Sequence, residues 1–189
     1  MTAYTLFRQG TAGGNAGNPT AENFGCQFAV SQACALTGIW WSSPSGADAL
    51  PDACAIYVAG TQALVAGTQN SSPSWSGAAA SGWVKCTYSG SVILSAGTNY
   101  VVVVHGKGVS SGWYGKTTSY WTSGAGASGV TNGPLSAPDN AAAVIGQDLV
   151  VSGASLAFPS GSSSGSNYWV DVEVTPATAG PALLMAGYL

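Results

Sequence analysis

Residues 167–174 read Asn-Tyr-Trp-Val-Asp-Val-Glu-Val, and the alternation in this stretch decides the fold class. Successive side chains of a β-strand point to opposite faces of the sheet, so a strand with one buried face repeats every second residue. The apolar parity is predicted to face a core: Tyr168, Val170, Val172 and Val174. The other parity carries Asp171 and Glu173, for which we expect a solvated outer face. A cation site or a catalytic carboxylate pair is the alternative.

Similar short runs, rich in valine, isoleucine and aromatic residues, recur every ~8–15 residues between glycine, serine, proline and asparagine clusters. The predicted strands cover 23–30, 34–41, 54–59, 63–67, 82–88, 91–94, 99–105, 111–115 and 167–174. Tyr100–Val104 lacks alternation, which predicts a central strand covered on both faces. One helical turn is expected over 140–145, capped by Asp139 or Asn140. The pattern predicts an all-β fold, an antiparallel β-sandwich.

Composition narrows the possible functions. The 189 residues suit one domain. Only 4 residues are Lys or Arg and the formal net charge is −3, which excludes an electrostatic nucleic-acid binder, because neutralising phosphates needs clustered basic side chains. A hydrophobic fraction of 46% argues against disorder. The sequence has neither an apolar run long enough for a membrane-spanning helix nor a secretory signal, so we expect a protein that stays in the cytoplasm or leaves it by lysis.

The two ends of the chain differ in composition from its middle. Residues 1–22 are predicted to form an extended arm, ahead of a sandwich domain over 23–174. Residues 175–189 are predicted to be a linker and an apolar tail, with the large side chains Leu183, Leu184, Met185, Tyr188 and Leu189. Termini are normally polar and solvated. These side chains are therefore expected either to pack back on the domain or to dock on a neighbouring subunit.

Several phrases follow one another along the chain in an order typical of a known family. They are Leu-Thr-Gly-Ile-Trp-Trp at 36–41, Ser-Gly-Trp-Val at 81–84, Leu-Ser-Ala-Gly-Thr-Asn-Tyr-Val at 94–101, Asn-Gly-Pro-Leu at 132–135, and Ala-Phe-Pro at 157–159 followed by Asn-Tyr-Trp-Val-Asp-Val at 167–172. In this order and spacing they resemble the bacterial module known as domain of unknown function 4082. The sequence departs from the family pattern at Trp40, where the family tends to have arginine, and at its four cysteines.

The resemblance implies a β-sandwich of the jelly-roll kind. Modules of this family are typically attached to secreted carbohydrate-active or surface proteins of bacteria, and similar modules occur in virion proteins of actinobacterial phages. No catalytic residues are established for the family, so the resemblance assigns none to this sequence.

The remaining reactive side chains follow no catalytic or metal-binding pattern. The cysteines, Cys26, Cys34, Cys54 and Cys86, lack the paired spacing of zinc sites, and buried free thiols are expected, with disulfides in one of three connectivities as the alternative. His105 ends the valine-rich strand, where we expect a hydrogen-bonding role in place of catalysis. Calcium oxygens could come from loop acids, but no calcium-loop motif connects Asp48, Asp52, Asp139 and Asp148. No metal or other cofactor is expected.

Aromatic residues are abundant, with 7 Trp and 8 Tyr. The rings that could contact a glycan or a partner protein are Trp40, Trp75, Trp113, Tyr114, Tyr120 and Trp121. Rings on loops beside amides and hydroxyls suit sugars, whose C–H faces stack on aromatic side chains. Bracing the sandwich is the alternative role for the same rings. Trp40, next to the inward-facing Trp41, is predicted to be an exposed ring.

These features predict a non-enzymatic structural protein of an actinobacterial phage particle, either a capsid decoration or a minor tail protein. The arm and the tail would contact other virion proteins, or further copies of this chain, by strand addition and apolar docking. The protein would be assembled into virions in the host cytoplasm. The alternative is a carbohydrate-binding or adhesion module that recognises a host cell-surface glycan. Neither prediction involves nucleic acid or a membrane, and only His105 and scattered carboxylates favour a hydrolase.

Overall fold

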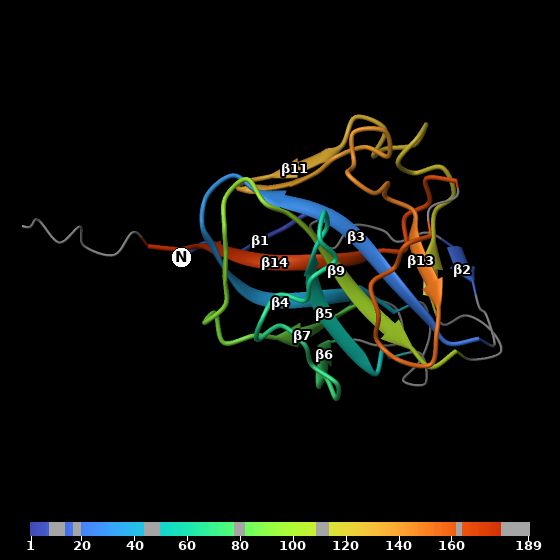
Figure 1. The fold of residues 1–189 in the computed structure, drawn as a ribbon, viewed down its shortest axis with the longest axis horizontal. Coiled ribbons are helices and arrows are strands. Elements are labelled where there is room, and N and C mark those ends of the chain that lie inside the picture. Colours follow the sequence, from blue (N-terminus) through green and yellow to red (C-terminus); the bar gives the residue numbers. More distant parts are fainter. Residues whose placement is uncertain are drawn as a thin grey trace, which may run out of the picture.

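The fold is known from a computed structural model, which describes residues 1–7, 14–16, 20–43, 50–77, 82–108, 114–161 and 164–178. Over these residues the protein is all-β, with two six-stranded antiparallel sheets and a two-stranded ribbon (Figure 1). The predicted antiparallel β-sandwich is confirmed. The described part of the chain contains no helix that is long and apolar enough to cross a membrane.

Each sheet combines long strands with short ones at its edges. The first sheet consists, in spatial order, of β1 (Tyr4–Thr5), β14 (Val170–Pro176), β4 (Cys34–Ser42), β7 (Trp83–Thr87) and β6 (Trp75–Gly77), and β8 (Ile93–Leu94) also pairs with β4. The second consists of β11 (Val130–Asn132), β12 (Leu135–Ala137), β3 (Glu22–Val30), β9 (Asn99–Gly106) and β5 (Ala53–Val58), and β13 (Leu149–Ser152) also pairs with β3. The ribbon joins β2 (Gly14–Ala16) to β10 (Tyr114–Lys116).

The main core lies between the two sheets and is built by alternating residues of the long strands. Its largest fully buried side chains include Phe24, Phe28, Leu36, Ile39 and Trp41. The rings of Phe24 and Trp41 stack across the two sheets, with centroids 6.1 Å apart. The valines of β14 are also fully buried, which confirms the inward parity predicted for this strand. Burying each such side chain stabilises the fold by roughly 1.5–3 kcal/mol.

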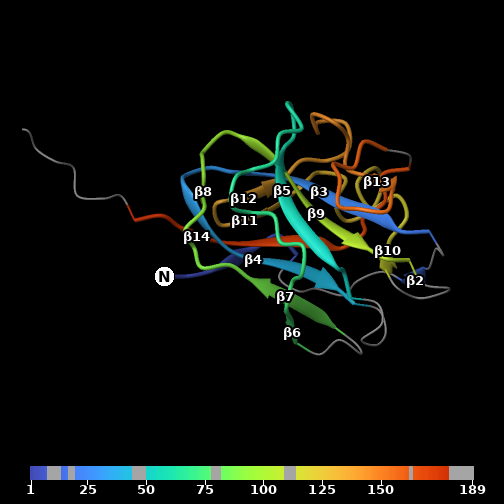
Figure 2. The ribbon, with the colours of Figure 1, turned by 60° about the horizontal axis from the view of Figure 1, so that its bottom comes forward.

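Strand β9 is covered on both faces, as its unbroken valine run predicts. Val102 and Val104 face the main core, whereas Val101 and Val103 belong to a second cluster on the outer face of the same sheet. Leu149 of β13 and the partly buried Phe158 pack in that cluster. Figure 2 shows the orange segment around β13 beside β3 and β9.

The outer face of β14 is buried, so the prediction of a solvated Asp171 and Glu173 is wrong. Asp171 is 0% exposed and Glu173 is 9% exposed. The backbone N–H groups of Leu6 and Phe7 donate to the two Asp171 carboxylate oxygens, at 2.9 and 3.0 Å. Residues after β1 therefore cover this face. The alternation within one strand contains no information on a segment more than 160 positions away that covers it.

The predicted arm over 1–22 is also corrected where the structure describes it. Tyr4 pairs with Val174, and the side chains of Leu6 and Phe7 are buried. Strand β2 pairs within the chain with β10, and β3 already begins at Glu22. The start of the chain thus completes its own sandwich. The predicted tail at 181–189 lies outside the described residues.

The remaining differences concern short elements. The strand predicted at 63–67 is a single bridge between Leu64 and Tyr57. The turn after Asp139 is capped as predicted, since its carboxylate accepts the N–H groups of Ala141 and Ala142 at 2.8 Å, but it does not continue as a helix. Strands β1, β6, β11, β12 and β13 have two to four residues, too few to show alternation in the sequence. Of the strand predicted at 111–115, residues 111–113 lie outside the described part.

Candidate functional site

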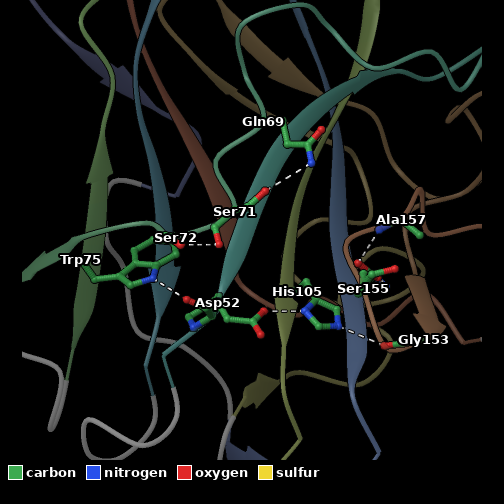
Figure 3. Close-up of polar contacts among 11 residues, drawn as sticks. Asp52, Gln69, Ser71, Ser72, Trp75, His105, Gly153, Ser155 and Ala157 are labelled. Atoms are coloured by element: carbon green, nitrogen blue, oxygen red, sulfur yellow. Dashed lines mark hydrogen bonds and ion pairs between the residues drawn. The ribbon is translucent and has the colours of Figure 1, made fainter.

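A polar groove crosses the end of the second sheet where β5 begins and β9 ends (Figure 3). Its larger hollow has a volume of about 690 Å³ and lies between Pro51, the loop 71–75 and Lys107. A second hollow of about 390 Å³ is lined by Gln69, His105 and Leu156, among others. Both hollows are lined by Asp52 and Ser71, so they adjoin, and together they are called the groove. Each is within or near the size range of small-molecule sites.

Asp52 and His105 form the centre of the groove. The antiparallel ladder places Ala53 of β5 opposite His105 of β9, and the Asp52 N–H donates to the His105 carbonyl at 2.9 Å. This backbone contact brings the two side chains together, with His105 Nδ1 at 2.5 Å from Asp52 Oδ1. The other ring nitrogen, Nε2, lies 3.0 Å from the carbonyl oxygen of Gly153. The histidine side chain is 4% exposed and the aspartate side chain 32%.

This arrangement fixes the imidazole instead of presenting it to a substrate. Each ring nitrogen of His105 faces an oxygen acceptor, so neither is free to take a proton from a hydroxyl group. In a Ser-His-Asp triad the nitrogen distal to the aspartate faces the nucleophile. Here the Gly153 carbonyl occupies that position. The hydrogen-bonding role predicted for a histidine at the strand end is therefore confirmed.

The wall of the larger hollow combines an aromatic ring with small polar groups. The half-buried Trp75 of β6 donates its indole N–H to the Pro51 carbonyl at 2.7 Å, which fixes the ring beside Asp52. On the same wall the Ser72 hydroxyl donates to the Ser71 carbonyl at 2.7 Å, and the Gln69 amide donates to the Ser71 hydroxyl at 3.4 Å. A fixed ring beside exposed hydroxyl and amide groups has the chemistry that binds a hydroxyl-rich, weakly charged ligand.

Of the other predicted contact residues, those around the 114–121 region brace the fold. Phe7 packs against four rings, with centroid distances of 5.2 Å to Trp169, 6.0 Å to Trp121, 6.2 Å to Tyr120 and 6.4 Å to Trp83. Trp121 is 1% exposed, so burial contradicts its prediction as a contact surface. The half-buried Tyr114 packs against Phe24 with the rings tilted by 43° and the centroids 4.6 Å apart. Trp113 lies outside the described residues.

Trp40 is half-buried on the outer face of the first sheet, away from the groove. Its indole N–H donates to Glu173 at 3.2 Å, and the Lys85 ammonium group lies 5.6 Å from its ring centroid. Glu173 also pairs with Lys85 and accepts from the Thr37 hydroxyl. Although burial raises the pKa of Glu173, these donors and the lysine charge lower it below its ordinary value. Trp40 is therefore part of an ionic cluster, and the prediction of an exposed ring is wrong.

Among the described residues, the loop acids Asp52, Asp139 and Asp148 do not gather into a metal site. The described residues contain no group of three histidine, cysteine or acidic side chains that could hold an ion together. Asp139 caps a turn, and Asp148 is buried where it accepts the Ser164 N–H at 2.6 Å. Asp48 lies outside the described residues. Asp52 is the loop acid that lines the groove, and its partner there is His105.

Three residues that line the groove are singled out by the sequence, each for a different role: Trp75 as a contact ring, His105 as a strand-end hydrogen-bonding residue and Asp52 as a possible calcium ligand. The sequence does not indicate that they meet, and it gives no signal for Gln69 and Ser71. One feature of the sequence is consistent with a contact between Asp52 and His105: Asp52 directly precedes one strand, and His105 lies at the end of another. The pairing of these strand ends depends on register, which the sequence does not state.

A family model described as "Domain of unknown function (DUF4082)" matches residues 9–170. The chain belongs to this family. The match confirms the resemblance that rests on the phrases between 36–41 and 167–172, and it includes every residue of the groove. A search of curated proteins finds no match to the chain. The description of the DUF4082 family states no activity, so the function of this DUF4082 domain is argued from its geometry.

Proposed function

We propose that this DUF4082 domain is a non-enzymatic structural component of an actinobacterial phage particle, a capsid decoration or minor tail protein that displays one end of its sandwich. The observation that supports this is the position of the chain ends relative to the groove. Pro176 pairs with Cys34, next to the turn that joins β3 and β4, whereas the groove lies at the far end of β3, where Asn23 pairs with His105. Figure 1 shows β1 and the end of β14 on the side away from β13.

This placement suits a module that is held at one end and presents the other. The chain leaves the described sandwich at Thr178 and continues into residues 179–189, which contain the five large apolar side chains predicted to dock. We assign the docking role to this tail, because Tyr4 and Thr5 of β1 and the following Leu6 and Phe7 pack within their own chain. The partners would be capsid or tail subunits or further copies of the chain, assembled in the host cytoplasm.

A non-enzymatic role agrees with the state of His105. Its two ring nitrogens are engaged by Asp52 and Gly153, and this is the single histidine of the chain. A histidine that acts as a general base needs a ring nitrogen within reach of the substrate proton.

Particle incorporation tests the structural role. Phage would be grown with the wild-type chain or with a chain lacking residues 181–189, and purified particles would be assayed for this protein by mass spectrometry. We expect the truncated chain to be absent from particles while it remains folded in the lysate. Lys107→Ala, at the opposite end, is the matched control and should be incorporated at the wild-type copy number. Wild-type occupancy of the truncated chain, or absence of the wild-type chain from every particle fraction, would contradict the proposal.

The groove favours a second function for the displayed end, recognition of a host cell-surface glycan. Trp75 supplies a fixed ring in the larger hollow, Asp52 and Ser71 supply polar groups to both hollows, and Gln69 supplies an amide to the smaller one. Sedimentation with host cell walls tests this function. Gln69→Ala with Ser71→Ala should abolish binding, and Trp75→Phe should retain part of it because a ring remains. Trp40→Ala, on the face without the groove, should bind as the wild type does. Unchanged binding of the Gln69 and Ser71 variant would exclude the groove.

A further inference from the structure

Two of the four cysteines, which come from different sheets, meet inside the sandwich. Cys54 lies on β5 in the second sheet and Cys86 on β7 in the first, and both side chains belong to the main core. Both lie next to Asn70, whose backbone pairs with Cys54 and whose side chain contacts the Cys86 sulfur, and each thiol shifts the pKa of the other. Cys26, in contrast, directs its thiol to the carbonyl oxygen of Gln27, at 3.7 Å.

Asn70 fixes the relative position of the two sulfur atoms. Its backbone pairs with that of Cys54 through two hydrogen bonds of 2.9 Å, and its side-chain amide donates to the Cys86 sulfur at 3.5 Å. On the other side the Tyr88 hydroxyl lies 3.4 Å from the Cys54 sulfur and donates to the Thr68 carbonyl at 2.6 Å. Thr68 and Asn70 belong to the segment that crosses from β5 to β6. The thiol pair is thus held at the edge of the sandwich where this segment joins the two sheets.

We propose that Cys54 and Cys86 are a dithiol that a small-molecule disulfide converts into an intersheet disulfide bond. The Cys86 thiolate attacks one sulfur of the reagent, forms a mixed disulfide and releases one equivalent of reduced thiol. Cys54 then loses its proton and attacks the Cys86 sulfur, which releases the second equivalent. The protein loses two hydrogen atoms and is oxidised, and the reagent takes up both hydrogens as it is reduced to two thiols.

The local electrostatics assign the order of attack. The hydrogen bonds from Cys54 and Asn70 lower the pKa of Cys86 despite its burial, and a thiolate is the nucleophile in disulfide exchange. The pKa of Cys54 is raised, because its thiol donates to Cys86 and because it is buried. Cys86 therefore acts first and Cys54 resolves the mixed disulfide.

The reagent reaches the pair by opening a short edge strand. Cys86 pairs with Trp75 of β6, a strand of three residues at the edge of the first sheet. Ser76 and Gly77 of the same strand are exposed. Short edge strands are among the least stable parts of a fold and open without global unfolding. We therefore expect the native protein to be oxidised slowly in the absence of a denaturant.

The test incubates the folded chain with 2-hydroxyethyl disulfide, then blocks remaining thiols under denaturing conditions and measures the intact mass. We expect two of the four cysteines to escape alkylation, and tryptic cleavage after Lys85 to give residues 86–107 linked to the preceding peptide. A bond that closes a loop of roughly 33 residues should raise the Tm by about 10 °C, reversibly with a reducing agent.

Matched variants identify the partners. Cys54→Ala and Cys86→Ala should each abolish the bond and the Tm change, whereas Cys34→Ala should retain both. Since alanine could destabilise the core, Cys54→Val serves as a second variant of similar size and must give the same chemical result. Complete alkylation of all four wild-type cysteines, or a bond that survives in the Cys54 variants, would overturn the proposal.

Discussion

Asp171 provides a sharp test of how the N-terminal segment covers β14. The carboxyl group is fully buried, and burial raises its pKa from 3.8 to about 7, although the N–H groups of Leu6, Phe7 and Val172 oppose this shift. Between these two pH values the folded protein retains a proton that the unfolded chain has released. Stability must therefore fall as pH rises through this window. The difference between the two pKa values corresponds to about 4 kcal/mol of unfolding free energy.

The assay is urea unfolding followed by tryptophan fluorescence between pH 4 and pH 8, on the wild type and on Asp171→Asn. Asparagine stays neutral, and both proteins keep Glu173 and His105, so their difference isolates the Asp171 carboxyl group. We expect the wild type to lose most of ~4 kcal/mol relative to the variant across this range. A difference that grows with pH would refute the reasoning, because it would mean that the three N–H donors outweigh burial and hold the pKa below its ordinary value.

Other side chains give further predictions from urea unfolding. Phe7→Ala should lower the unfolding free energy by about 3–5 kcal/mol, because the ring packs among four other rings. A loss under ~1 kcal/mol would mean that the Phe7 ring is solvated, as in an extended arm. Gly133→Ala should cost about 2–4 kcal/mol, since φ is 59° and the new methyl group would overlap the Tyr4 ring. Gly97→Ala, with φ of 72° but open space around it, is the control and should cost only about 1 kcal/mol. His105→Ala should cost about 1–3 kcal/mol, because the contacts of the ring with the Asp52 carboxylate and the Gly153 carbonyl are lost; a neutral effect would show that these contacts are not formed.

The sequence predicts features that arise within a single strand, and it does not predict contacts between segments that are distant in the chain. Strands β3, β4, β9 and β14 are long enough for periodicity to reveal them, and the inward valines of β14 follow directly from it. The burial of Asp171 does not follow, because it arises from contact with Leu6 and Phe7 at the other end of the chain.

The candidate site shows the same division. His105 is recognisable as a strand-end residue, but its contact with Asp52 depends on the register of β5 against β9. The proximity of Cys54 and Cys86 depends on how the two sheets pack against each other, and the residue pattern within one strand does not predict this packing. The aromatic loop misleads for a related reason. Trp121 belongs to a stretch whose composition resembles a sugar-binding surface, but its ring packs against Phe7 of the same chain.

The groove and the thiol pair are physically connected through Asn70. Its side-chain oxygen accepts the Ser72 N–H at 3.0 Å on the groove wall, and its side-chain nitrogen donates to Cys86. Forming the intersheet disulfide shifts the Cys86 sulfur that accepts from the Asn70 amide, so we expect the wall at 71–72 to adjust. The described sandwich leads into the tail at its opposite end, where Pro176 pairs with Cys34. Oxidation should therefore change binding of the wild type to cell walls while its incorporation into particles stays the same, and an equal effect on both would mean that the disulfide acts on the whole fold.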